Sequence, residues 1–176
     1  ACSGAGNGIY GYEIIGTSLV PISGQPFASG NAPLAVAASP TDDVIVAIEG
    51  GTVASYFRGA SGGLVPINSL IPGTAPADLS FSSDGAYLYV ANQGSNSITA
   101  YSVGGSGTLS ELAGSPFTVL TQGGTAPAAV SASPVTDFLF TANGNGTVSR
   151  FGINGDGTLT SLGSATAVDT TLVEVE

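Results

Sequence analysis

Short apolar segments separated by glycine-rich turns recur along the whole chain. In the clearest stretch, the strand-like segments are 78–81, 86–91, 97–103 and 108–112. The turns between them are rich in Gly, Ser and Asp-Gly, which supply the positive φ angles that tight hairpins require. Gly or Pro interrupts the chain so often that only residues 164–176 exceed ten residues without either. An ordinary helix is longer than these intervals, so we predict an all-β chain.

Three sequence features repeat in a fixed order at intervals of about 45 residues, the period of a propeller blade. A Pro precedes a strand, a Ser-Pro or Ser-Asp-Gly turn follows that strand, and a Leu comes after a small or polar residue. Each period holds four strand candidates, the number in a blade. The segments 86–91 and 138–142 are apolar on both faces, as expected for sheets that are covered on both sides by neighbours.

We therefore predict a β-propeller-like fold with about three and a half four-stranded antiparallel blades. Residues 1–8 form a tail, and the repeats occupy 9–163. The repeats consist of a half blade, 9–32, and three full blades, 33–75, 76–126 and 127–163. A last strand, 164–176, follows them.

The half blade and the last strand leave edges that need partners, because an exposed strand edge recruits another strand. Three arrangements remain open. The last strand closes a small ring onto the half blade, it pairs with a neighbouring chain, or the sequence is a piece of a longer propeller. For the first two arrangements the predicted closing or donor strand consists of Thr171, Leu172, Val173, Glu174 and Val175.

The charge balance excludes several classes of function. The chain has 12 acidic residues, 2 basic residues and no His, with a formal net charge of −10. Binding to nucleic acid or to an anionic membrane surface needs Lys or Arg, and Arg58 and Arg150 are the only cations. Mechanisms that use His or Lys are excluded within this chain. No apolar run approaches the ~20 residues of a membrane span.

Two elements of the repeat resemble those of a known family. Residues 83–92 resemble the SPDG-x-x-LYVAN element of lactonase-type (6-phosphogluconolactonase-like) propellers, and residues 114–117, Gly-Ser-Pro-Phe, resemble the GSPF part of its second element. The resemblance covers roughly residues 9–163. It implies a seven-bladed ring of about twice this length and a central site with basic and acidic side chains. This chain has no His or Lys for such a site.

Other candidate sites are sparse. Glu49 occupies the place that Asn92 and Asn143 take in the next two repeats. If these three side chains converge at one rim, their oxygens suit Ca²⁺; alternatively, the Asn residues cap strand ends. We predict no cofactor. Cys2 lies in a segment that resembles a bacterial lipoprotein junction, so it is a candidate for a lipid anchor or an interchain disulfide. Asn145 starts a glycosylation motif that also suits a hairpin turn.

The scarcity of Lys and the abundance of Ser, Thr and Gly favour an extracellular or bacterial cell-surface location. Our leading prediction is a non-enzymatic structural or interaction protein that self-assembles through its terminal strands into a homo-oligomer or filament. Two alternatives stay open. One is a lactonase-like propeller enzyme that acts on a sugar lactone, and the other is an adhesin that binds carbohydrate or Ca²⁺.

Overall fold

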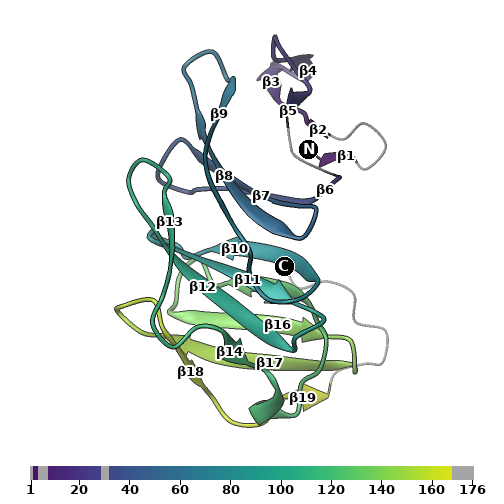
Figure 1. Cartoon of the computed structure of the whole chain (residues 1–176), viewed down its shortest axis with the longest axis vertical. Helices are drawn as coiled ribbons and strands as arrows, with labels where there is room; N and C mark the ends of the chain where they lie inside the picture. Colours follow the sequence, from purple (N-terminus) through teal and green to yellow (C-terminus); the bar gives the residue numbers. More distant parts are fainter. Residues whose placement is uncertain (1, 4–7, 29–31, 168–176) are drawn as a thin grey trace.

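The computed structural model describes residues 2–3, 8–28 and 32–167 (Figure 1). Almost every element in them is a β-strand. The one helix among these residues is a 3-10 turn at Leu120–Gln122, which follows the second full blade. Within the described ranges, therefore, no helix has the length and apolar character needed to span a membrane.

Three antiparallel sheets form three full blades, which confirms the predicted partial propeller. The first contains β6 (Pro33–Ala38), β7 (Val44–Glu49), β8 (Thr52–Arg58) and β9 (Leu64–Leu70). The second contains β10 (Pro76–Phe81), β11 (Tyr87–Asn92), β12 (Ser97–Val103), β13 (Leu109–Glu111) and β14 (Phe117–Thr118). The third contains β15 (Pro127–Ala132), β16 (Phe138–Asn143), β17 (Thr147–Ile153), β18 (Leu159–Ser161) and β19 (Thr166–Ala167).

The N-terminal strands form a partial blade that begins within the residues expected to be a tail, 1–8. They are β1 (Cys2–Ser3), β2 (Gly8–Ile9), β3 (Tyr12–Ile15), β4 (Ser18–Pro21) and β5 (Phe27–Ala28). β2 pairs with β1 and β5, and β3 pairs with β4. The pairing of β5 with β2 repeats that of β14 with β12 in the second full blade, so β2 and β3 together correspond to the third strand of a blade.

The segment after residue 163 differs from the prediction. Thr166 and Ala167 do not form a separate closing or donor strand, but pair as β19 with Val148 and Thr147 in their own blade. The reason is that β18 covers only Phe151–Ile153 of β17 and leaves the start of that edge unpaired. The third full blade therefore extends past the predicted boundary.

Neighbouring blades pack face to face. Between the first and second full blades, Val44 and Ile48 are fully or almost fully buried in one cluster with Leu79 and Leu88. Between the second and third, Tyr89 and Ile98 pack with residues of the third blade that include Leu139 and Phe151. The N-terminal Ile9 packs on Ala47 and Tyr56 of the first full blade. The first and second full blades are therefore covered on both faces, which explains why their second strands lack the polar–apolar alternation of a half-exposed sheet.

The blades follow one another along an open series. Among the first strands of the full blades, β6 contacts β10 and β10 contacts β15, while β1 contacts β6. The half blade and the third full blade lie at opposite ends of the long axis (Figure 1). The described residues therefore form part of a propeller and not a closed ring.

A hairpin from one blade fits onto the second strand of the preceding blade. The Tyr87 and Tyr89 hydroxyls of β11 donate to the Gly155 and Gly157 carbonyls of the β17–β18 turn, each at 3.0 Å. Gly157 has a φ of +80°, and a Cβ at this position would overlap the ring of Tyr87. Gly107 meets Val44 in the same way one blade earlier. These glycines allow adjacent blades to approach closely.

We predict that Gly157→Ala lowers the free energy of unfolding by about 2–4 kcal/mol, because the methyl group adds backbone strain and overlaps Tyr87. Urea denaturation measures this change. Gly155→Ala is the matched control, since a Cβ at Gly155 meets no atom within 4 Å. Equal stability of the two variants would contradict the proposed packing between blades.

Candidate functional site

The first strands of the full blades, β6, β10 and β15, form the inner edge of the series. Each pairs with only one strand of its own sheet, so its other edge faces the neighbouring blades. In propellers the blades surround a central channel. We therefore take the channel-side edges of these three strands as the candidate functional site.

Asp78 is the single ionisable side chain on the three first strands. Its Oδ2 accepts a hydrogen bond from the Val130 N–H of β15 at 2.8 Å. Two residues later, the Ser80 hydroxyl oxygen accepts one from the Ala132 N–H at 3.1 Å. These bonds connect two blades and satisfy part of the open edge of β15. They also hold the Asp78 carboxylate against the open edge of β15.

A hollow of about 320 Å³ lies beside these strands, at the end where the Ser-Pro turns begin. Residues from all three full blades line it, including Ala37 of β6, Leu79 and Phe81 of β10, and Ala132 of β15. Its size is at the lower end of the range for small-molecule sites.

Glu49 is the last residue of β7, at the end of its blade opposite to the hollow, and its side chain is buried, with 4% of the residue exposed. The Tyr56 hydroxyl is 2.8 Å from Oε1 and 2.9 Å from Oε2 of this carboxylate, and it donates to it. Burial, and then the hydrogen bond to Glu49, raise the pKa of Tyr56 above its ordinary value. The hydroxyl therefore remains protonated and available as a donor at neutral pH.

Asn92 and Asn143 are buried at the positions equivalent to Glu49. The Asn92 amide donates to Thr99 Oγ1 at 2.8 Å, and its oxygen accepts the Gly73 N–H at 3.1 Å. The Asn143 amide donates to Ser149 Oγ at 2.9 Å. These contacts hold each side chain within its own blade, and Asn92 also binds the linker that precedes the blade.

The structure thus gives Glu49, Asn92 and Asn143 separate roles in three blades. In the described part of the chain, no three His, Cys, Asp or Glu side chains gather as a metal-binding group. The Ca²⁺ site stays a prediction, and the observed contacts favour the alternative in which the Asn residues stabilise strand ends.

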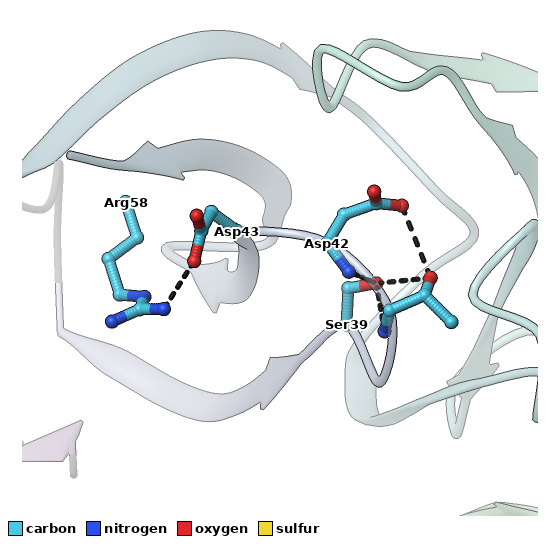
Figure 2. A network of polar contacts seen from close by, with 5 residues as sticks. Ser39, Asp42, Asp43 and Arg58 are labelled. Carbon is cyan, nitrogen blue, oxygen red and sulfur yellow. Dashed lines mark hydrogen bonds and ion pairs between the residues drawn. The ribbon is translucent and has the colours of Figure 1, made fainter. Parts of the chain in front are cut away.

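Most of the other acidic residues organise turns. Asp84 accepts hydrogen bonds from the Ser82 hydroxyl and the Ala86 N–H, and these bonds lower its pKa. Figure 2 shows a second turn, in which Asp43 forms an ion pair with Arg58. Both side chains of that pair are about half exposed. Neither residue belongs to a first strand, but Arg58 lines a hollow together with Val36, Ala37 and Ala38 of β6.

Arg150 also lies outside the candidate site. It is exposed on β17, and its guanidinium carbon is 5.9 Å from the centre of the Phe138 ring. Neither cation of the chain thus lies on a first strand.

The predicted modification and assembly residues are only partly placed. Cys2 lies in β1 opposite Ile9. The Asn145 amide donates to the Gly123 carbonyl at 2.9 Å, and its oxygen accepts the Thr147 hydroxyl at 2.8 Å, which fits the alternative of a hairpin turn. Thr171, Leu172, Val173, Glu174 and Val175 lie outside the described residues. Lipidation, disulfide formation and glycosylation stay predictions.

Sequence reasoning placed Asp78 in a strand but gave it no functional role. The signal was the alternation of Asp78 and Ser80 with Leu79 and Phe81 in an otherwise apolar repeat. Polar residues at every second position share one face of a strand. In the structure, they reach the edge of the next blade.

Comparison with known proteins identifies similar propellers. The model of the family "Lactonase, 7-bladed beta-propeller" matches residues 2–115. Among curated proteins, none matches this sequence significantly.

Solved structures resemble the chain over most of its length. A protein from Lactobacillus plantarum is 20% identical, with a TM-score of 0.80 over 94% of this chain and 50% of that one. A protein from Bacteroides fragilis, assigned as a 6-phosphogluconolactonase, is 22% identical, with a TM-score of 0.73 over 88% and 45%. The periplasmic gluconolactonase of Pseudomonas aeruginosa is 22% identical, with a TM-score of 0.69 over 87% and 43%. The chain spans about half the length of these proteins.

These matches correct the leading functional prediction. A non-enzymatic structural protein that self-assembles through terminal strands is contradicted, because the matching family is one of lactonase propellers. The lactonase-like alternative fits better. The leading prediction gave decisive weight to the absence of His and Lys from the sequence.

We predict that Tyr56→Phe lowers the free energy of unfolding by about 1.5–3 kcal/mol, because the buried Glu49 carboxylate loses a donor. Tyr101→Phe is the control. The Tyr101 hydroxyl is buried without a hydrogen-bond partner among the described residues, so its removal should not destabilise the protein. Thermal or urea unfolding of both variants measures the difference. A larger loss for Tyr101→Phe would contradict the role given to the Tyr56–Glu49 contact.

Proposed function

Because the chain belongs to the family of seven-bladed lactonase propellers, we propose that it acts in the hydrolysis of a sugar lactone. The first strands β6, β10 and β15 would form its part of the channel wall. The observation that carries this proposal is the Asp78 carboxylate, which the Val130 N–H fixes against the open edge of β15.

Lactone hydrolysis adds water to the carbonyl carbon and breaks the ring C–O bond. A general base accelerates the first step when it removes a proton from the attacking water. The chain contains no His, so a carboxylate is the base that its composition favours. In the proposed reaction, Asp78 takes the proton from water and returns it to the ring oxygen as that oxygen leaves. The product is the open-chain hydroxy acid.

The hydrogen bond from Val130 matters for this role because it holds one carboxylate oxygen in place. A catalytic group that is already oriented needs no reorganisation as the reaction proceeds. The other oxygen, Oδ1, is the atom that would accept the proton from water.

The charges of the chain favour an uncharged lactone over a phosphorylated one. Recognition of phosphate commonly uses Arg or Lys, and the first strands carry neither. Arg58 is engaged with Asp43 of the β6–β7 turn, and Arg150 lies over Phe138. The net charge of −10 also disfavours an anionic substrate.

The extracellular or cell-surface location remains part of this proposal. It is supported by the scarcity of Lys and Arg in the sequence. Mass spectrometry of the protein from its natural source would test this proposal together with lipidation at Cys2 and glycosylation at Asn145.

We predict that the chain hydrolyses at least one uncharged sugar lactone and that Asp78→Asn lowers kcat by about 100-fold or more, as expected for loss of a general base. Proton release from D-glucono-δ-lactone and related lactones measures the rate above spontaneous hydrolysis. The asparagine side chain of this variant keeps an oxygen that can accept the Val130 N–H, so the fold should be retained.

The matched control is Glu111→Gln, which removes an exposed carboxylate from the outer strand β13 and should leave kcat unchanged. A wild-type chain that fails to hydrolyse any of the lactones would overturn the proposed function. Full activity in Asp78→Asn would overturn the role of Asp78.

A further inference from the structure

The hollow beside the first strands lies where an inter-blade contact is missing. Between the second and third full blades, Asp78 and Ser80 of β10 accept the Val130 and Ala132 N–H groups of β15. Between the first and second, β6 has Ala35 and Ala37 at the positions equivalent to Asp78 and Ser80. Alanine has no acceptor atom in its side chain, so β6 cannot make the same contact with β10.

The direction of the backbone groups in β10 follows from its register. The Ser82 N–H donates to the Tyr87 carbonyl of β11 at 2.9 Å, so Ser80, two residues earlier, also points its N–H toward β11. Leu79 and Phe81 alternate with it and point their N–H groups away from β11. They are equivalent to Val130 and Ala132 in β15, whose N–H groups meet Asp78 and Ser80.

Within the described residues, no side chain or turn accepts the Leu79 and Phe81 N–H groups. The hollow of about 320 Å³ lies against this edge and includes Leu79, Phe81 and Ala37 in its lining. Backbone N–H groups are nearly always paired in native proteins, with protein, ligand or water. The pair of donors at this hollow is therefore available to a bound molecule.

We propose that this hollow binds an uncharged polyhydroxylated molecule, of the class of sugars and their lactones, through the Leu79 and Phe81 N–H groups. Residues two apart in a strand are separated by about 6.7 Å. The two donors are therefore too far apart to share one oxygen and need two acceptors on the same ligand. The carbonyls of the same residues face the same edge. That of Phe81 also accepts the Ser80 hydroxyl at 3.4 Å, so the Leu79 carbonyl is the acceptor offered to the ligand, and a ligand that both donates and accepts fits best.

Hydroxyl groups meet this requirement, because each is both a donor and an acceptor. A carboxylate or phosphate only accepts, and the hollow has no cation in its lining. Pro40 of the first blade and Pro134 of the third also line it, and neither has a backbone N–H to extend the row of donors. A short ligand therefore fits this hollow better than a continuous peptide strand.

The inference rests on the proposed function only for the choice of a sugar lactone as natural ligand; binding at the hollow does not require hydrolysis. The test is therefore a binding measurement. The ¹⁵N-labelled chain is titrated with D-glucose and with D-glucono-δ-lactam, whose ring amide replaces the lactone ester. We expect the Leu79 and Phe81 amide resonances to shift in a saturable way, with smaller changes at Val130 and Ala132.

Two variants introduce into β6 the acceptor side chains, Asp and Ser, with which β10 contacts β15. Ala37→Ser places a hydroxyl toward the Phe81 N–H, and Ala35→Asp places a carboxylate toward the Leu79 N–H. Each competes with the ligand for one donor, so affinity should fall about three- to tenfold per variant. Ala129→Asp, at the equivalent position of β15, is the control for added charge and should leave binding unchanged.

The outcomes separate this inference from the proposed function. Saturable shifts at Leu79 and Phe81 in a chain that hydrolyses no lactone would support the binding site and overturn the enzymatic proposal. Hydrolysis without shifts at these two amides would overturn the binding site alone. Binding that Ala37→Ser and Ala35→Asp leave unchanged would also overturn it, and so would equal shifts with D-glucose 6-phosphate.

Discussion

Each central blade of this protein buries both faces of its sheet, so it depends on a neighbour on either side. Val44, Leu88 and Ile98 are inaccessible to solvent only because another blade covers them. Apolar surface removed from water is the main source of folding free energy. Turns, linkers and glycines of the chain allow the blades to pack closely enough for this burial. Gly107 and Gly157 let a hairpin approach the preceding blade, and Asn92 ties a linker to its own sheet.

The same packing leaves backbone hydrogen-bonding groups unpaired at the inner edge of each blade. The candidate site consists of the residues that do or do not satisfy these groups. A first strand has hydrogen-bonding groups on both edges but pairs with one strand only. At β15 the side chains of Asp78 and Ser80 satisfy those groups. At β10 the alanines of β6 do not. One contact therefore fixes a carboxylate against the edge of β15, and the missing contact leaves backbone donors beside a hollow. Both features belong to the wall of the proposed lactone channel.

The sequence was sufficient to predict the fold because blade geometry is local. Turn residues such as those of 82–85 and the apolar strand 86–91 determine a hairpin without distant information, and the repeat period determines the architecture. The pairing of Thr166 and Ala167 was not predicted, since it depends on how much of β17 the strand β18 leaves free. The candidate site was not predicted for a related reason. The contact from Asp78 to Val130 joins residues 52 positions apart. The absence of this contact at Ala35 cannot be recognised from the sequence of one repeat alone.

The inner edge of β10 is open, whereas that of β15 is closed by the side chains of Asp78 and Ser80. Native-state hydrogen exchange of backbone amides tests this difference directly, since an amide without a protein acceptor exchanges through smaller openings than a bonded one. The account predicts faster exchange for Leu79 and Phe81 than for Val130 and Ala132, in the chain without ligand. Equal protection of the two pairs would contradict it.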